Sequence, residues 1–145
     1  MTGHAAAHPA PAEHAVPLGA LWFGLFGAPV VWSIQLMLNF ALVAHSCFPV
    51  SEPRTTPLFD ALGITVLLVS VGALVIALAA FVTAWRSWRT TRREHAGGEE
   101  LLLEAGEGRT RFMATAGMLV SGLFVLGVVM NAMPLFLVPL CGVTG

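Results

Sequence analysis

Residues 85–93 have the sequence WRSWRTTRR and hold four of the seven Lys and Arg residues of the chain, all seven of which are arginine. Two more arginines follow before residue 112, and long apolar runs flank this segment on both sides. The cytoplasmic ends of membrane helices collect Lys and Arg, because the positive-inside bias sets orientation during insertion. The segment therefore predicts a cytoplasmic loop over residues 85–111 and assigns every other residue to a side of the membrane. The arginines that carry this prediction are Arg86, Arg89, Arg92, Arg93, Arg109 and Arg111.

The composition indicates an integral membrane protein with a single domain. The chain has 145 residues, of which 57% are hydrophobic and only 10% charged, whereas a soluble domain carries roughly 25% charged residues. A net charge of −1 argues against a nucleic-acid partner, since binding to phosphates needs a basic patch. Neither a nucleophile elbow nor a phosphate-binding loop occurs. We therefore predict a protein that is not an enzyme and has no cofactor of its own.

Three apolar runs predict an all-α fold with three transmembrane helices, over about 18–44, 61–84 and 112–137. A bilayer core needs roughly 20 apolar residues, and each run is long enough. With the arginine-rich loop in the cytoplasm, the N-terminus is cytoplasmic and the C-terminus periplasmic. Residues 1–17 are mostly Ala, Pro and His, and their composition predicts a disordered tail. Its three histidines could bind a metal loosely, but a solvated tail is the simpler interpretation.

Small residues recur at helical spacing in the second and third apolar runs. Ala73 and Ala77 belong to one such row, and Gly117 and Ser121 to another. Small side chains let helices approach closely, which drives packing where lipid is as apolar as the helices themselves. We expect these faces to pack helices together and to dock the protein on a larger membrane complex.

Three amide side chains fall inside the predicted spans. Gln35 and Asn39 share one face of the first span with Trp32, and Asn131 lies in the third. An unpaired amide in hydrocarbon costs several kcal/mol, so we expect interhelical hydrogen bonds. The alternative is a contact with a quinone, a haem or a transferred proton. No Asp, Glu, Lys or Arg lies within a span, which argues against an ion path in this protein.

The two cysteines, Cys47 and Cys141, fall on the same, periplasmic side of the predicted topology. Thiols in an oxidising compartment tend to pair, so we predict a disulfide. Asn39 and Asn131 lie at similar depths below these cysteines, roughly 12–15 Å along a helix. The first and third spans are therefore expected to be neighbours, with the asparagines facing each other. A competing interpretation is a Cu(I) site of soft ligands, formed by His45, Cys47, Met130, Met133 and Cys141.

Two segments carry a family resemblance: LWFGLFGAP at residues 21–29, leading through Trp32 to Cys47, and GRTRF at residues 108–112, leading through Asn131 to Cys141. Together they resemble small three-span bacterial proteins found beside genes for haem–copper cytochrome c oxidases. The resemblance covers about half of the chain and implies an accessory or assembly role in the respiratory chain, without a cofactor. It carries no functional residues.

These observations lead to three hypotheses for a protein of the bacterial cytoplasmic membrane. The first is an accessory subunit of a respiratory complex, a haem–copper oxidase or its supercomplex, in contact with oxidase subunits and lipid. The second is an assembly factor that handles copper through His45, Cys47 and Cys141. The third is a membrane protein that uses the same two cysteines as a reversible redox pair.

Overall fold

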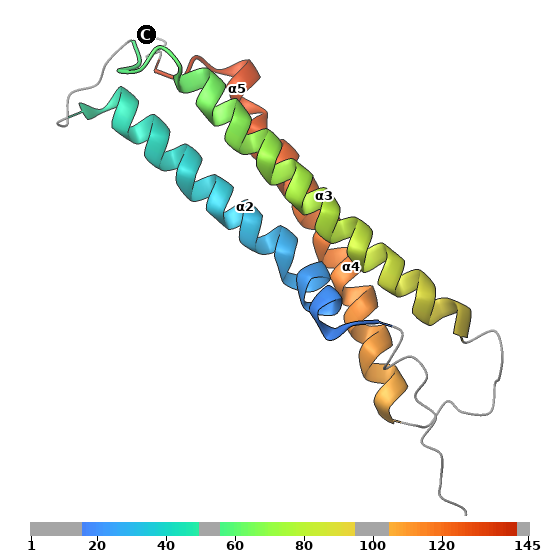
Figure 1. The fold of residues 1–145 in the computed structure, drawn as a ribbon. Helices are drawn as coiled ribbons and strands as arrows, with labels where there is room; N and C mark the ends of the chain where they lie inside the picture. Colours follow the sequence, from blue (N-terminus) through green and yellow to red (C-terminus); the bar gives the residue numbers. More distant parts are fainter. Residues whose placement is uncertain (1–15, 50–55, 95–104, 142–145) are drawn as a thin grey trace, which may run out of the picture.

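The described part of the protein forms a bundle of three long helices and one short one (Figure 1). The computed structural model describes residues 16–49, 56–94 and 105–141, with the helix path alone for 91–94 and 105–111. Over these residues it has no strand. The helices are α2 (Leu18–Cys47), α3 (Leu62–Glu94), α4 (Ala105–Ala132) and α5 (Pro134–Leu137). The prediction of an all-α chain is confirmed for this part.

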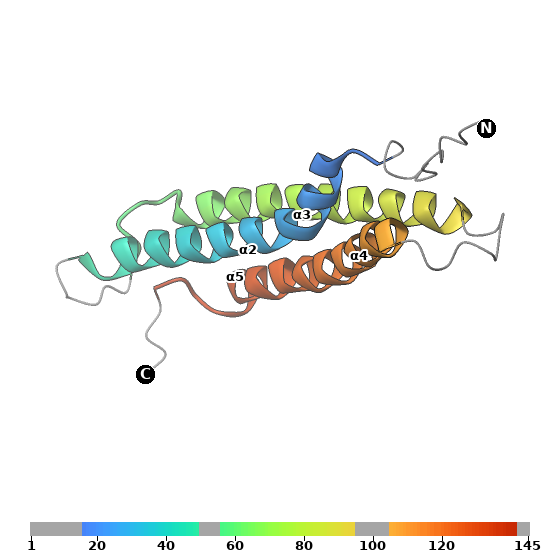
Figure 2. The same ribbon diagram turned by 90° about the horizontal axis from the view of Figure 1, so that it is seen from below.

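Each long helix has a segment apolar and long enough to cross a membrane. These segments are Leu18–Cys47, Leu62–Thr90 and Phe112–Leu137, so the structure supports a multi-pass membrane protein. The three helices lie side by side along their length (Figures 1 and 2), and each contacts the other two. The predicted neighbourhood of the first and third spans is therefore confirmed.

The helix ends differ from the predicted span ends. Helix α2 continues to Cys47, so His45 lies in its last turn and not in a loop. Helix α3 continues through the arginine-rich segment to Glu94, because no helix breaker occurs before that residue. The third span is interrupted near Pro134, which has no N–H to continue the helix and instead begins α5. In the first span, α2 runs unbroken through Pro29, and its axis turns in the N-terminal part (Figure 2).

The interior of the bundle is filled mainly by small side chains. Ala77 and Ala80 of α3 are completely buried, and Ala73 and Ala84 on the same face are almost so. This alanine face packs against α2, where a methyl group added to Gly27 would lie 3.0 Å from Cβ of Ala80. The small faces expected to dock a partner are thus used within the chain, and that part of the prediction is wrong.

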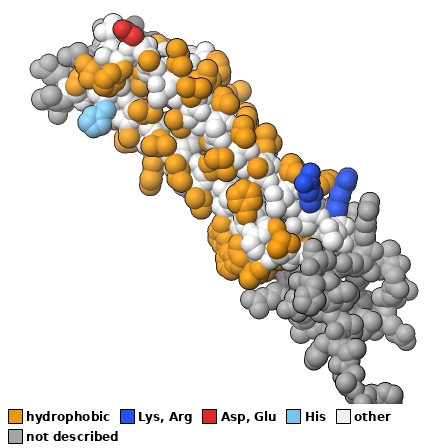
Figure 3. All heavy atoms as spheres, in the orientation of Figure 1, with side chains coloured by type: hydrophobic (Ala, Val, Ile, Leu, Met, Phe, Trp, Pro, Cys, Tyr) orange, Lys and Arg blue, Asp and Glu red, His pale blue; other side chains and the backbone are white. Residues whose placement is uncertain are grey.

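Large apolar side chains cover the outside of the bundle (Figure 3). The side chains of Met37 and Phe40 on α2 are 73% and 75% exposed, and Leu68 on α3 and Leu123 on α4 are similarly open. In a soluble protein the large apolar side chains lie inside, whereas here they lie outside. Lipid explains the difference, because burying apolar area away from lipid brings no gain in free energy, while close approach of the helix backbones does stabilise the bundle.

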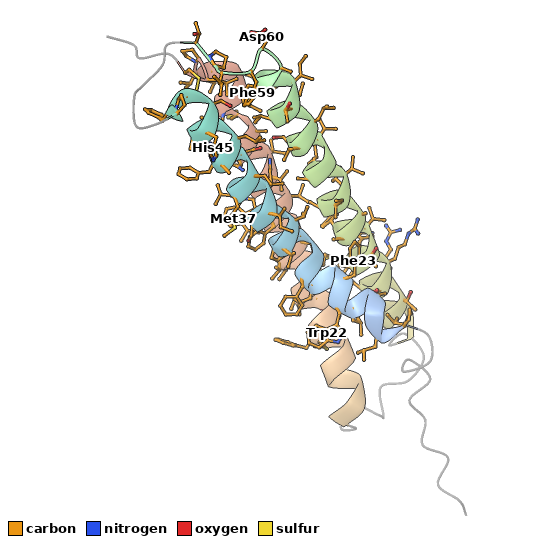
Figure 4. All side chains as sticks on the ribbon, turned by 60° about the vertical axis from the view of Figure 1, so that its left-hand side comes forward. Trp22, Phe23, Met37, His45, Phe59 and Asp60 are labelled. Carbon is orange, nitrogen blue, oxygen red and sulfur yellow. A yellow bond between two sulfur atoms is a disulfide. The ribbon has the colours of Figure 1, made fainter. Side chains whose placement is uncertain are left out.

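The two ends of the bundle differ in charge. The described arginine side chains gather at one end, and the described histidine and acidic side chains at the other (Figure 3). Figure 4 places Asp60 at the latter end, His45 further along α2 on the same side of its middle, and Trp22 towards the former end. We call these the arginine end and the disulfide end.

Of the predicted disordered tail, residues 1–15 lie outside the described part, whereas Val16 is buried against Leu21 and Ala114.

Candidate functional site

A disulfide between Cys47 and Cys141 closes one end of the bundle, as the sequence predicted. The two Cα atoms are 5.3 Å apart, and the residues are 94 positions apart in the chain. Cys47 is the last residue of α2 and is only 2% exposed. It packs against Leu62 and Val66 at the start of α3, and its Sγ lies 3.1 Å from the carbonyl oxygen of Leu140. The bond therefore joins the ends of the first and third spans, and apolar side chains at the start of α3 pack against it.

The side chains proposed as soft ligands for copper do not line one common pocket. Cys47 is buried and bonded to Cys141, whereas His45, Met130 and Met133 have exposed side chains. In the part of the chain that the structure describes, no three His, Cys, Asp or Glu side chains are grouped to hold a metal ion. With the disulfide formed, neither sulfur is a thiolate ligand.

Three amide side chains lie between the disulfide end and the middle of the bundle. They are the only Asn and Gln residues of the whole chain: Gln35, Asn39 and Asn131. Gln35 is 1% exposed, and neither its Oε1 nor its Nε2 has a hydrogen-bond partner among the described residues. Such unpaired groups are expensive, since a buried amide without a partner costs about 1–3 kcal/mol.

Asn39 is paired on one side only. Its Nδ2 donates to Oγ of Ser70 on α3 over 3.4 Å, and that hydroxyl donates in turn to the carbonyl of Val66 over 2.9 Å. Oδ1 of Asn39 and Nδ2 of Asn131 are buried and have no hydrogen-bond partner within the described part of the chain. The predicted interhelical hydrogen bond thus runs from α2 to α3. The two asparagines do not bond to each other, in contrast to the expected direct contact, but both line the same cavity.

Asn39 and Asn131 line one cavity of about 330 Å³ near the disulfide end. Residues of all four helices and the segment after α5 form its wall. The lining residues are Leu36, Asn39, Phe40, Val43, Val66, Asn131, Pro134, Leu135, Val138, Pro139 and Leu140. Phe40 and Val138 are 75% and 57% exposed, so the cavity opens sideways to the surroundings of the bundle. None of the lining side chains is ionisable.

Towards the arginine end, α2 and α4 are in close contact. The hydroxyl of Ser121 on α4 donates to the carbonyl of Gly24 on α2, and both residues are buried. A methyl group on Gly117 would meet the backbone of Gly24 at 3.4 Å. Trp32 lies edge-on to Phe124 with ring centroids 5.4 Å apart. The predicted packing residues on α3 and α4 therefore hold the chain's own helices together.

The arginine end presents its positive charge to the surroundings. Arg86 and Arg89 are exposed, and the Arg89 guanidinium lies 5.3 Å from the centroid of the Trp85 ring. Trp85 and Trp88 are themselves in ring contact at 5.4 Å. Arg92 and Arg93 follow in the last turn of α3, and Arg109 and Arg111 lie in the first turns of α4. Their backbone positions bring all six arginines of the predicted loop to helix ends.

Sequence reasoning missed two parts of this arrangement. Ser70 was not predicted as the partner of Asn39, although it is the only Ser or Thr between residues 66 and 82 and was for that reason a possible partner. The cavity was not predicted, because it depends on how the segment after Pro134 folds back towards α2.

Comparison with models of protein families, with curated protein sequences and with solved structures gives no significant match.

Proposed function

We propose that this chain is an accessory, non-catalytic subunit of a respiratory complex in the bacterial cytoplasmic membrane, a haem–copper cytochrome c oxidase or its supercomplex. The observation that supports it best is the chemistry of the interior. Among the described residues, the buried polar side chains are one amide and four serines, and none is ionisable. Proton relays and many ion pathways use ionisable groups at membrane depth, whereas helix packing uses small residues. The sequence resemblance to oxidase-associated three-span proteins supplies the choice of complex.

The proposed orientation places the arginine end in the cytoplasm and the disulfide end in the periplasm. The exposed Arg86 and Arg89 support the first assignment through the positive-inside bias. The Cys47–Cys141 bond supports the second, because disulfides persist in oxidising compartments such as the periplasm.

Docking would use the large outward side chains, because the small ones are occupied within the bundle. Met37, Leu68 and Leu123 represent the open faces of α2, α3 and α4, with exposures of 73%, 65% and 67%. A partner helix would replace lipid on one of these faces and leave the others in the bilayer.

Photo-cross-linking in intact membranes, followed by tag purification in mild detergent, tests the proposal. A photoreactive residue would be placed singly at Met37, Leu68 or Leu123, and the products identified by mass spectrometry. We expect oxidase subunits in stoichiometric amounts in the purified material and cross-linked to one of the three positions. A chain that purifies alone and gives only lipid adducts at all three positions would refute the proposal.

The alternative is an assembly factor that handles copper or responds to redox conditions. The observation in its favour is the disulfide with the exposed His45 two residues before Cys47. Such a factor would bind the oxidase transiently, so substoichiometric recovery that depends on reductant would favour it over a subunit.

A further inference from the structure

The cavity near the disulfide end combines an apolar wall with unpaired amides at membrane depth. Asn39 lies about two helical turns before Cys47, or roughly 12 Å along α2. Asn131 reaches the same cavity from α4. Between them they offer one unpaired acceptor, Oδ1 of Asn39, and one unpaired donor, Nδ2 of Asn131. Both groups sit where the surrounding solvent is hydrocarbon and offers no hydrogen bonds.

A hydroxyl group satisfies both atoms at once. It donates through its hydrogen and accepts through its oxygen, so one hydroxyl can pair with both Oδ1 of Asn39 and Nδ2 of Asn131 once these buried amides turn towards the cavity. A carbonyl or an ether oxygen only accepts, and would leave Asn39 unpaired. The terminal torsion of an asparagine is soft, which allows either amide to turn towards a molecule in the cavity.

The wall restricts the rest of the ligand. No lining side chain carries a charge, and a charged group at this depth is costly without a partner, so the ligand is neutral. A volume of about 330 Å³ is at the lower end of the 300–1,000 Å³ that is typical of ligand pockets, and corresponds to a single or fused ring. The exposed Phe40 and Val138 mark a lateral opening, through which a lipid-soluble molecule can enter and leave its tail in the bilayer.

We propose that this cavity binds a neutral, lipid-soluble ring with a phenolic hydroxyl, as in a hydroquinone. The hydroxyl would lie between Asn39 and Asn131, the ring would lie against the apolar wall formed by Leu135 and Leu140, and the tail would pass out beside Phe40. Binding requires no partner protein, so it is independent of the proposed docking on a respiratory complex.

The composition of the chain offers a direct assay. Asn39 and Asn131 are the only asparagines, so selective ¹⁵N labelling of asparagine side chains gives two NH₂ signals in the whole protein. The full chain in detergent micelles would be titrated with 2-decyl-1,4-hydroquinone under argon, and in parallel with its dimethyl ether. The ether partitions into micelles in the same way but cannot donate a hydrogen bond.

We expect both NH₂ signals to shift with the hydroquinone and to saturate at one common concentration. The ether should bind about tenfold more weakly, since it leaves Oδ1 of Asn39 unpaired. Asn131→Leu should abolish saturable binding, whereas Thr83→Val should preserve it, because the Thr83 hydroxyl bonds only to its own helix, at Ala79.

Three results would overturn the proposal. Equal shifts with the hydroquinone and the ether would indicate partitioning alone, and unmoved signals would indicate amides that are satisfied by water or by each other. Saturable binding that survives Asn131→Leu would place the ligand elsewhere. If Asn131→Leu does not fold, the comparison of the two ligands on the unaltered chain still decides the question.

Discussion

The close contact between α2 and α3 should make Gly24 intolerant of a single methyl group. A Cβ added at Gly24 would lie 3.0 Å from Cβ of Ala84, 3.2 Å from its Cα and 3.3 Å from its N. Two of these three atoms belong to the backbone, so no side-chain rotation relieves the contact. The helices must separate along the alanine face of α3, which also carries Ala80 and Ala77.

The expected magnitude follows from two opposing terms. Replacing Gly by Ala inside a helix stabilises it by up to ~1 kcal/mol, while overpacking of a well-filled interior costs ~1–3 kcal/mol. Gly72 provides the matched control, because a methyl group there would have no heavy atom of the rest of the described chain within 4 Å, apart from the nearby backbone of its own helix. The helix-propensity gain is common to both variants and cancels, so we expect Gly24→Ala to be about 1–3 kcal/mol less stable than Gly72→Ala.

Reversible unfolding in mixed micelles, followed by tryptophan fluorescence at increasing SDS, measures this difference. The compensating change Ala84→Gly in the Gly24→Ala background removes the nearest clash, and should restore part of the lost stability. Equal unfolding midpoints for Gly24→Ala and Gly72→Ala would mean that the two helices do not approach each other as described, and the proposed close packing of α2 and α3 would have to be abandoned.

In the same assay, Ser121→Ala should lower the free energy of unfolding by about 0.6–1.7 kcal/mol, the range of interhelical hydrogen bonds in membranes. Ser33→Ala should change it little, because the Ser33 hydroxyl bonds to its own helix. Similar losses for both variants would contradict a special role of Ser121. Mass analysis of unreduced protein from an oxidising compartment should find no free thiol, and two thiols that label without reductant would contradict the bridge. Reduction of the Cys47–Cys141 bond should destabilise the bundle by less than the ~4.7 kcal/mol of a 100-residue loop in water, because helices inserted in a membrane regain little conformational freedom. A reporter fused after Gly145 should be active only outside the cytoplasm, and cytoplasmic activity would reverse the proposed topology.

The sequence predicted the elements well because the relevant signals are local. Apolar runs near 18–44, 61–84 and 112–137 correspond to the three spans, since length and hydropathy alone decide whether a helix suits a bilayer. The ends were less well predicted. Helix formation does not stop at the membrane surface, so α3 continues to Glu94, ten residues beyond the predicted end of the span.

The candidate site was predicted only in part, because its geometry is not local. Pairing of Cys47 with Cys141 followed from their placement on one side of the membrane. The choice of Ser70 as the partner of Asn39 depends on the rotation of α3 about its own axis, which no pattern in the sequence fixes. The direction of the small faces was mistaken for the same reason: a row such as Ala73 and Ala77 shows that a close contact exists, but not whether the contacting helix belongs to the same chain.

The covalent link between α2 and the segment after α5 also bears on how the protein is made. Cys141 follows α4 in the chain, so it can meet Cys47 only after the third helix has been laid down beside the first. A chain whose third helix stalls during biosynthesis keeps an unbridged Cys47, however well its first two helices have inserted. Until it is reduced, the disulfide therefore marks chains whose third helix has been placed beside the first, and the ratio of bridged to unbridged chains in an unreduced membrane sample measures their share.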